Sequence, residues 1–424
     1  MLRGIYSLFY IGVYPFFLPR EFLKKPKELR TTWIKERFAL YTKAYFSSLK
    51  RKKVWIHAVS VGEVLAVVPL VKRLSDEFDV VLSTITETGR EVALNKLKGL
   101  PVKVIFLPVD CPFAVRRAIS AIKPSMLLIA ETEIWPNLIM EAVKKMPVAL
   151  INARLSEKSY KRYKKLSFFF APILNSLSFI GVQEKIYAER FADIGVKPEK
   201  LYLTGNVKFD LEIKDESFPW AKQLPSPVII AGSTHHPEEK LILESFLNVF
   251  SEGTLILAPR HPQRLEEVKN LVKSQLKPGA GFTPLTQLEK GELPQGNPFI
   301  ILVDKMGVLG ALYRICDLAI IGGSFIPHGG QNPLEAIYWK KPVIFGPSME
   351  NFPFIKEFLE KGLCFQTDSS ALPSLLKTFK KAPQEFEKVG EKAYKLLKEK
   401  SGATKKTFDL VKKYFCLTKS RVSE

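Results

Sequence analysis

The sequence predicts an α/β protein with two Rossmann-like domains, each with a parallel β-sheet covered by helices. Short apolar runs rich in β-branched residues alternate with stretches of helical periodicity, which is typical of a parallel sheet buried on both faces. This alternation occurs in two series, separated by a stretch with charge and proline but no clear periodicity. The length of 424 residues also exceeds what one domain usually needs.

The first series covers residues 54–152. Helical periodicity is clearest at residues 65–74 and 114–122, between predicted strands. These strands are VWIHAV (54–59), VVLST (80–84), VIFLPV (104–109), MLLIA (126–130) and VALIN (148–152).

The second series covers residues 227–346 and has the same character. Two such halves are typical of one class of nucleotide-sugar glycosyltransferases, although two-domain dehydrogenases and epimerases share the pattern. The predicted strands are PVIIAG (227–232), TLILAP (254–259), PFIILV (298–303), DLAIIG (317–322) and PVIFG (342–346).

These patterns predict five segments. We expect a membrane anchor with a basic segment over residues 1–30, and a first domain over 31–206. A linker over 207–225 leads to a second domain over 226–384. A lysine-rich helical tail over 385–424 is expected to pack back on the body.

The N-terminus suggests contact with a membrane. Residues 4–19 are uncharged and rich in aromatics, with Arg3 before them and several basic residues after them. The run is shorter than the roughly 20 residues that span a bilayer, so the helix either spans or lies in the interface. If the helix spans the membrane, the positive charge that follows it places the rest of the protein in the cytoplasm. A buried core helix is the alternative.

Composition narrows the possible partners. A net charge of +21 favours nucleic acid, an anionic membrane surface or acidic substrates, and residues 154–165 form one basic cluster. The four cysteines are far apart, which argues against a disulfide framework and fits a reducing cytosol. No HExxH or Asp-x-Asp motif occurs, so we predict no metal and no cofactor.

Polar residues in the first half follow predicted strands, where ligands bind in open α/β sheets. Glu63, in HAVSVGEV, lies in the first turn of a helix, where it could act as a general base or only stabilise the helix N-terminus. Glu131 follows the strand MLLIA. Arg154 and Arg90 are candidates for binding a carboxylate or phosphate.

The second half carries the residues expected at a nucleotide site. Hydroxyl groups ahead of a helix predict a phosphate cradle, and an arginine fork suits a phosphate. A proline in the first helical turn, its asparagine cap and a carboxylate that accepts from ribose hydroxyls complete the pattern. These residues are Ser233, Thr234, Arg260, His261, Asn332, Pro333 and Glu335.

Seven motifs, in order and spacing, resemble the family of 3-deoxy-D-manno-octulosonic acid (Kdo) transferases. The likeness extends from TTWIKERF (31–38) to GPSMENF (346–352). It implies a GT-B type glycosyltransferase with an acceptor-binding first domain, a CMP-Kdo-binding second domain and an N-terminal anchor on the cytoplasmic face of the inner membrane. The motifs are HAVSVGEV, ETEIWPN, NARLSEKSY, GNVKFD, GSTHHPEE, APRHPQR and GGQNPLEA.

The resemblance further implies an inverting, metal-independent transfer of Kdo from CMP-Kdo to lipid IVA, in lipopolysaccharide core synthesis. Glu63 falls on the family's general base, and Glu131 and Lys208 on residues that stabilise the transition state. Lys208 is included on resemblance alone. The CMP site would comprise Arg260, His261, Met306, Gly307, Val308, Asn332, Pro333, Leu334 and Glu335.

Two positions depart from the family pattern. Val308 stands where the family usually has glutamate, and Gln331 where it usually has histidine. The main alternative is a related enzyme with a UDP-sugar donor, such as a lipid A disaccharide synthase or a peptidoglycan GlcNAc transferase. A nucleic-acid-binding protein is a remote alternative, since the sequence lacks a homeodomain, zinc finger or RRM signature.

Overall fold

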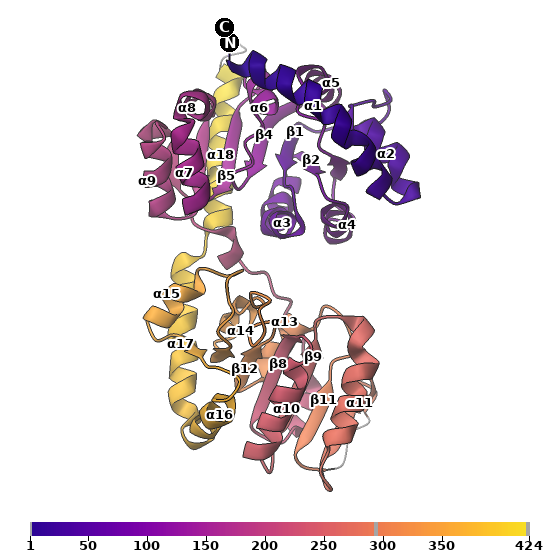
Figure 1. Cartoon of the computed structure of the whole chain (residues 1–424), viewed down its shortest axis with the longest axis vertical. Helices are drawn as coiled ribbons and strands as arrows, with labels where there is room; N and C mark the ends of the chain where they lie inside the picture. Colours follow the sequence, from indigo (N-terminus) through magenta and orange to yellow (C-terminus); the bar gives the residue numbers. More distant parts are fainter. Residues whose placement is uncertain (1, 292–295, 421–424) are drawn as a thin grey trace. The chain divides into compact units, whose positions relative to one another are not determined.

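The computed structural model describes residues 2–291 and 296–420, with side chains for 4–291 and 296–415. The chain forms two compact units (Figure 1). The first domain comprises the residues up to 210 together with those from 400 onward, and the second comprises residues 211–399. The two parallel-sheet α/β domains predicted from the sequence are therefore confirmed.

The first domain is built on a seven-stranded parallel sheet with the order β3-β2-β1-β4-β5-β6-β7. The order reverses between β1 and β4, and ligands of such sheets bind beyond the carboxyl ends of the strands at this switch point. Its strands are β1 (Lys53–His57), β2 (Asp79–Thr84), β3 (Val102–Phe106), β4 (Pro124–Ala130), β5 (Val148–Ala153), β6 (Phe179–Val182) and β7 (Leu201–Leu203).

Successive side chains of these strands enter opposite faces of the sheet. Trp55 and Leu127 belong to one core cluster, while Ile56 and Leu128 belong to the other. Because both faces are covered, the strands are continuous apolar runs. The helices of this domain are α1 (Leu2–Lys24), α2 (Lys27–Arg37), α3 (Val61–Ser75), α4 (Glu87–Lys96), α5 (Pro112–Ile122), α6 (Pro136–Ala142), α7 (Glu157–Lys165), α8 (Ser167–Asn175), α9 (Lys185–Asp193) and α18 (Ala403–Ser420), with short η1 (Pro198–Lys200) and η2 (Val207–Phe209).

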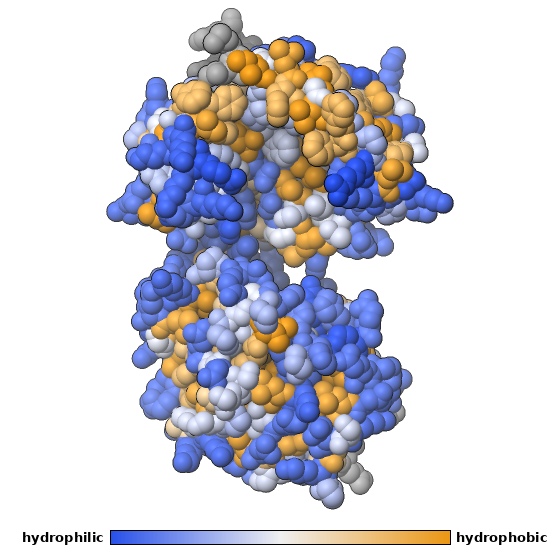
Figure 2. All heavy atoms as spheres, viewed as in Figure 1, coloured by the Kyte–Doolittle hydropathy of each residue, from blue (hydrophilic) through white to orange (hydrophobic). Residues whose placement is uncertain are grey.

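The N-terminal helix α1 is docked on the first domain by one face. The hydroxyl of Tyr6 donates to Oδ2 of Asp110 at 2.8 Å, and Arg37 donates to the hydroxyl of Tyr14 at 3.0 Å. Other α1 side chains are exposed, including Phe9 and Phe16, and Figure 2 shows the hydrophobic surface over this helix. Among the described residues, no helix combines the length and apolar character needed to cross a membrane.

The second domain has its own seven-stranded parallel sheet, in the order β10-β11-β9-β8-β12-β13-β14, with a switch point between β8 and β12. The strands are β8 (Val228–Thr234), β9 (Thr254–Pro259), β10 (Gly281–Pro284), β11 (Phe299–Leu302), β12 (Leu318–Ile321), β13 (Val343–Phe345) and β14 (Phe365–Gln366). The helices are η3 (Pro219–Gln223), α10 (Glu238–Val249), η4 (Pro262–Arg264), α11 (Leu265–Gln275), α12 (Leu285–Leu288), α13 (Leu309–Leu312), η5 (Tyr313–Ile315), α14 (Leu334–Tyr338), α15 (Ile355–Glu360), α16 (Leu372–Lys381) and α17 (Pro383–Lys400).

The C-terminal tail is divided between the two domains. Phe386 of α17 stacks on Phe365, at 4.1 Å between ring centroids, within the second domain. Phe415 of α18 packs on Phe78 of the first domain at 4.7 Å. The division therefore falls near residue 400, not at 384/385, because each helix buries its aromatic residues in a different core. Residues 211–225 of the predicted linker belong to the second domain.

Candidate functional site

Glu63 is held at the switch point of the first sheet, where α3 follows β1. Its Oε2 accepts from the backbone N–H of Val59 at 2.9 Å, and its Oε1 accepts from the hydroxyl of Ser60 at 3.2 Å. In return, Ser60 Oγ caps α3 by accepting from the N–H of Glu63. These contacts, a variant of the capping box, fix the carboxylate, so Glu63 both stabilises the start of α3 and holds a fixed position at the switch point.

The environment of Glu63 raises the pKa of its carboxyl group. Burial is the main cause that raises its pKa to about 7, and the negative charges of Glu131 and Glu133 add to this effect. Burial and the charge of Glu131 also raise the pKa of Glu133. A carboxylate with a pKa near 7 accepts a proton far more readily at neutral pH than an ordinary glutamate.

Glu131 lies across the switch point, directly after β4, in a left-handed conformation with φ of 51°. Such a backbone costs on the order of 1 kcal/mol for a non-glycine residue and tends to occur at functional sites. The N–H of Glu131 donates to the carbonyl of Ile151 at 2.9 Å, which holds it there. Its Oε2 lies 3.9 Å from Nε of Arg154, a side chain 40% exposed.

Lys208 is brought to the same end of the first sheet. The N–H of Val207 donates to Oδ1 of Asn152, which ties η2 to the end of β5. Val207 also packs on Ala66 of α3, the helix that carries Glu63. Within the described part of the chain, the ammonium group of Lys208 has no acidic partner.

Arg90 is already neutralised by the protein. Its guanidinium pairs with Glu36, at 2.9 and 3.4 Å, and that carboxylate is 1% exposed. Glu36 also accepts from the N–H of Phe106, so the pair ties α4 to α2 and β3. The geometry gives Arg90 a structural role and leaves Arg154 as the exposed arginine of the two predicted anion-binding candidates.

Ser233 and Thr234 end β8 at the switch point of the second sheet. Ser233 is left-handed, with φ of 56°, and half-buried. Thr234 is fully buried, and its hydroxyl has no partner in the described part of the structure. The next N–H, that of His235, donates to Oε2 of Glu238, so part of the predicted phosphate cradle is filled by a carboxylate of the protein.

Basic and imidazole groups gather beside these residues. Arg260 and His261 follow β9 and are exposed. The ring of His235 lies 5.2 Å from that of His261 and 4.2 Å from that of His328. Across the described residues, Arg260, His261 and His328 form no ion pair with an acidic side chain. These three exposed groups therefore suit an anionic ligand.

The loop of residues 306–308 only partly faces solvent. Met306 is 63% exposed, whereas Val308 is 5% exposed and precedes α13. The apolar side chain at 308 therefore packs inside the domain, which suits valine at this departure from the expected pattern. Gly307 has a positive φ of 83°, which glycine adopts without strain.

Residues 332–335 lead into α14 and form its first positions. Oδ1 of Asn332 accepts from the N–H of Leu334 at 3.1 Å, but the N-cap of α14 is Pro333, one residue after the predicted cap. Pro333 and Leu334 are buried inside the second domain, while Glu335 is half-buried. A Cβ at Gly310 would lie 3.3 Å from Oε2 of Glu335, so the glycine leaves room for this carboxylate.

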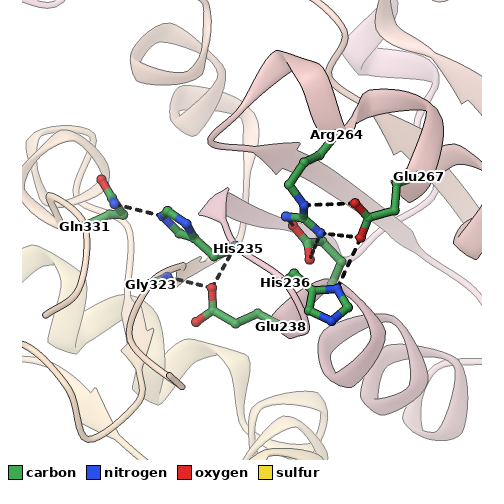
Figure 3. A network of polar contacts seen from close by, with 8 residues as sticks. His235, His236, Glu238, Arg264, Glu267, Gly323 and Gln331 are labelled. Atoms are coloured by element: carbon green, nitrogen blue, oxygen red, sulfur yellow. Dashed lines mark hydrogen bonds and ion pairs between the residues drawn. The ribbon is translucent and has the colours of Figure 1, made fainter. Parts of the chain in front are cut away.

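Sequence reasoning missed three residues of this region: His235, Glu238 and His328. His235 is 8% exposed, and its pKa is lowered to about 4, chiefly by burial and then by His328 and His261. Nε2 of Gln331 lies 3.1 Å from Nε2 of His235, as suits a donor to a neutral ring (Figure 3). No set of His, Cys, Asp and Glu among the described residues is arranged to hold a metal ion.

Comparisons with known proteins identify the family. Residues 32–211 match the family model of 3-deoxy-D-manno-octulosonic-acid transferase (kdotransferase). The chain is 35% identical to a 3-deoxy-D-manno-octulosonic acid transferase of Haemophilus influenzae, over 89% of this chain and 90% of the relative. It is 33% identical to the enzyme of that name from Chlamydia muridarum, over 72% of this chain and 73% of the relative.

Solved structures agree on the fold. UDP-GlcNAc 2-epimerase from Neisseria meningitidis covers 82% of this chain and 99% of its own length, with 15% identity and a TM-score of 0.52. At that identity the likeness shows a two-domain α/β fold and nothing about the reaction. The sequence relatives are closer, and they show that this chain belongs to the Kdo transferase family and is a glycosyltransferase of lipopolysaccharide synthesis.

Proposed function

We propose that this protein transfers Kdo from CMP-Kdo to lipid IVA with inversion of configuration, at the cytoplasmic face of the inner membrane. The observation that carries the proposal is Glu63, a carboxylate fixed at the switch point of the first sheet with a pKa of about 7. In a family that transfers Kdo, such a group is suited to remove the proton of an acceptor hydroxyl.

The reaction is a single displacement. Glu63 takes the proton of an acceptor sugar hydroxyl while its oxygen attacks the anomeric carbon of Kdo. The bond from that carbon to the phosphate oxygen breaks, and CMP leaves with its electron pair. Lys208, which has no acidic partner among the described residues, offsets negative charge in the transition state. Glu131, which is held beside Arg154, also stabilises the transition state.

The second domain binds the donor. Arg260, His261 and His328 supply positive or hydrogen-bonding groups for a phosphate, and Glu335 accepts from the ribose hydroxyls. CMP leaves as a monophosphate, whose charge these side chains can offset without a metal ion. Ser233 is the predicted hydroxyl that remains partly accessible at the end of β8.

The acceptor is a lipid, so the enzyme must work at a membrane surface. The exposed face of α1 is apolar, and α7 carries exposed basic side chains at Lys158, Lys161, Arg162, Lys164 and Lys165. The ring centroids of Tyr6 in α1 and Phe169 in α8 are 6.2 Å apart. Because α8 follows α7 directly, the apolar surface of α1 and the basic surface of α7 are neighbours. An apolar face beside a basic face favours binding in the interface of an anionic bilayer.

Kdo transfer is tested with purified protein, CMP-Kdo generated in situ and lipid IVA. The expected result is a Kdo-containing lipid product and stabilisation of the protein by CMP but not by UDP in a thermal-shift assay. Consumption of a UDP-sugar without Kdo transfer would show that the donor is wrong. Loss of product on omission of CMP-Kdo synthetase serves as the control.

The membrane surface is tested separately by co-sedimentation with anionic and neutral vesicles. Replacing both Phe9 and Phe16, which are 68% and 83% exposed, with serine should weaken binding to anionic vesicles by at least about tenfold. Leu203→Ser is the matched control, because this side chain is 59% exposed in β7. Equal vesicle binding by all three proteins would contradict the interfacial role of α1.

A further inference from the structure

Glu238 ties together the loops that leave the two central strands of the second sheet. This carboxylate is 1% exposed and stands at the first position of α10. Its Oε2 accepts from the N–H of His235 at 2.9 Å and of Gly323 at 2.6 Å (Figure 3). Its Oε1 accepts from the N–H of Ser324 at 3.0 Å and of Phe325 at 2.9 Å.

These N–H groups form the kind of backbone nest that binds phosphate in many nucleotide-binding proteins. Here the carboxylate of Glu238 fills the nest. The glycine-rich loop of residues 322–331 therefore offers the N–H groups of 323–325 to the protein and not to a ligand. Anion recognition beside it is left to side chains, and their placement depends on the shape of this loop.

The loop sets the spacing of the polar side chains around it. Gly323 has φ of 65°, and a Cβ there would lie 3.2 Å from His328, 3.3 Å from Gln331 and 3.4 Å from His235. Gly322 is packed even more tightly, since a Cβ would lie 2.4 Å from the carbonyl oxygen of Ser233. A small shift of the loop thus moves His328 and Gln331 relative to His235.

We propose that Glu238 is a positioning residue for the nucleotide of the donor. It acts as an internal anion that fixes the glycine-rich loop, so that His235, His328 and Gln331 face the phosphate without contact between Glu238 and the ligand. The inference rests on the proposed function, because it takes the second domain as the CMP-binding domain.

The neighbouring residue provides a matched control. Glu239 is also 1% exposed and lies in the same helical turn, but its carboxylate pairs with Arg264 at 2.8 and 3.1 Å. Glu238→Gln and Glu239→Gln each remove one buried negative charge from α10. Only the first disturbs the loop, because an amide has a single acceptor oxygen and its NH₂ would face backbone N–H donors.

The test is calorimetric titration of the full chain with CMP, alongside thermal unfolding without ligand. We expect both variants to unfold at lower temperature. Glu238→Gln should raise the Kd for CMP at least about tenfold, whereas Glu239→Gln should leave it within about twofold of the wild type. A purely structural role would lower the unfolding temperature and leave the Kd of the folded protein unchanged.

The outcomes separate the two proposals. If the wild type does not bind CMP, the proposed donor is wrong. If the wild type binds CMP and folded Glu238→Gln binds equally well, or both variants weaken binding alike, the positioning role is overturned. If Glu238→Gln does not fold, Glu238→Asp decides: its shorter carboxylate should raise the Kd several-fold, and an unchanged Kd would reject the proposal.

Discussion

The two switch points of this molecule have opposite electrostatic character. At the first, Glu63, Glu131 and Glu133 lie close enough for their charges to interact. At the second, Arg260 and three imidazoles gather, and the nearby Glu238 is occupied by four backbone N–H groups. Two seven-stranded parallel sheets, each with one switch point, thus present groups of opposite charge at the ends of their strands.

In the proposed reaction, this difference divides the roles between the two switch points. Buried like charges raise a carboxyl pKa and create a base that works near neutral pH, whereas cations without counterions attract a phosphate. Substitutions at the first switch point should therefore affect the chemical step, and those at the second should affect nucleotide affinity. This separation is open to direct test.

The largest effect is expected from Glu63→Gln. The amide keeps the size of the side chain but cannot take the acceptor's proton, so kcat should fall by about 10²- to 10⁴-fold. The Kd for CMP, measured by titration, should stay within about twofold of the wild-type value. Retention of full activity in this variant would rule out Glu63 as the base while leaving the family assignment intact.

The next largest effects are expected from replacing one cationic side chain in each domain. Arg260→Ala should raise the Kd for CMP by about 10- to 100-fold, since a hydrogen bond to a charged group contributes about 1.5–3 kcal/mol. Lys208→Ala should lower kcat and leave the Kd for CMP unchanged. The reverse pattern would show that the division of labour between the two switch points is wrong.

The sequence predicts the parts of this comparison that depend on local pattern. Central strands such as β4 are continuous apolar runs, and Glu131 follows β4 directly, so its place at the carboxyl end of the sheet could be predicted. The short strands β7 and β14 were not predicted, because two or three residues carry no periodicity. The capping of α3 by Ser60 is likewise local.

What escaped prediction depends on contacts between distant residues. Nothing near Arg90 in the sequence indicates that Glu36, 54 residues earlier, neutralises it. Glu238 looks like an ordinary acidic residue in a first helical turn, and its role emerges only through the loop at 323–325, more than 80 residues later. Opposite charges and free N–H groups pair in space, and the sequence does not record which pairs form.

A smaller effect concerns the pH dependence of the reaction. Glu63 must be deprotonated to act as a base, and its pKa of about 7 means that kcat/KM should fall about tenfold per unit as the pH drops below 7. Glu133→Gln removes one of the like charges that raise this pKa. The acid limb of the profile should therefore move to lower pH, with CMP affinity unchanged. An acid limb that stays in place would show that Glu133 does not influence the base.

The smallest effect links the base to stability. Because the folded pKa of Glu63 is raised from 4.5 to about 7, the folded state binds more protons than the unfolded state between these values. The contribution of Glu63 to stability is therefore fully present below pH 4.5 and is lost as the pH rises through 7. Glu63→Gln cannot ionise, so its unfolding temperature relative to the wild type should increase by a few degrees between pH 5 and pH 8.

Arg260→Ala, at the other switch point, should show no such trend. A constant difference between Glu63→Gln and the wild type over this range would mean that Glu63 titrates as an ordinary glutamate, and that the crowding of carboxylates does not tune it for catalysis.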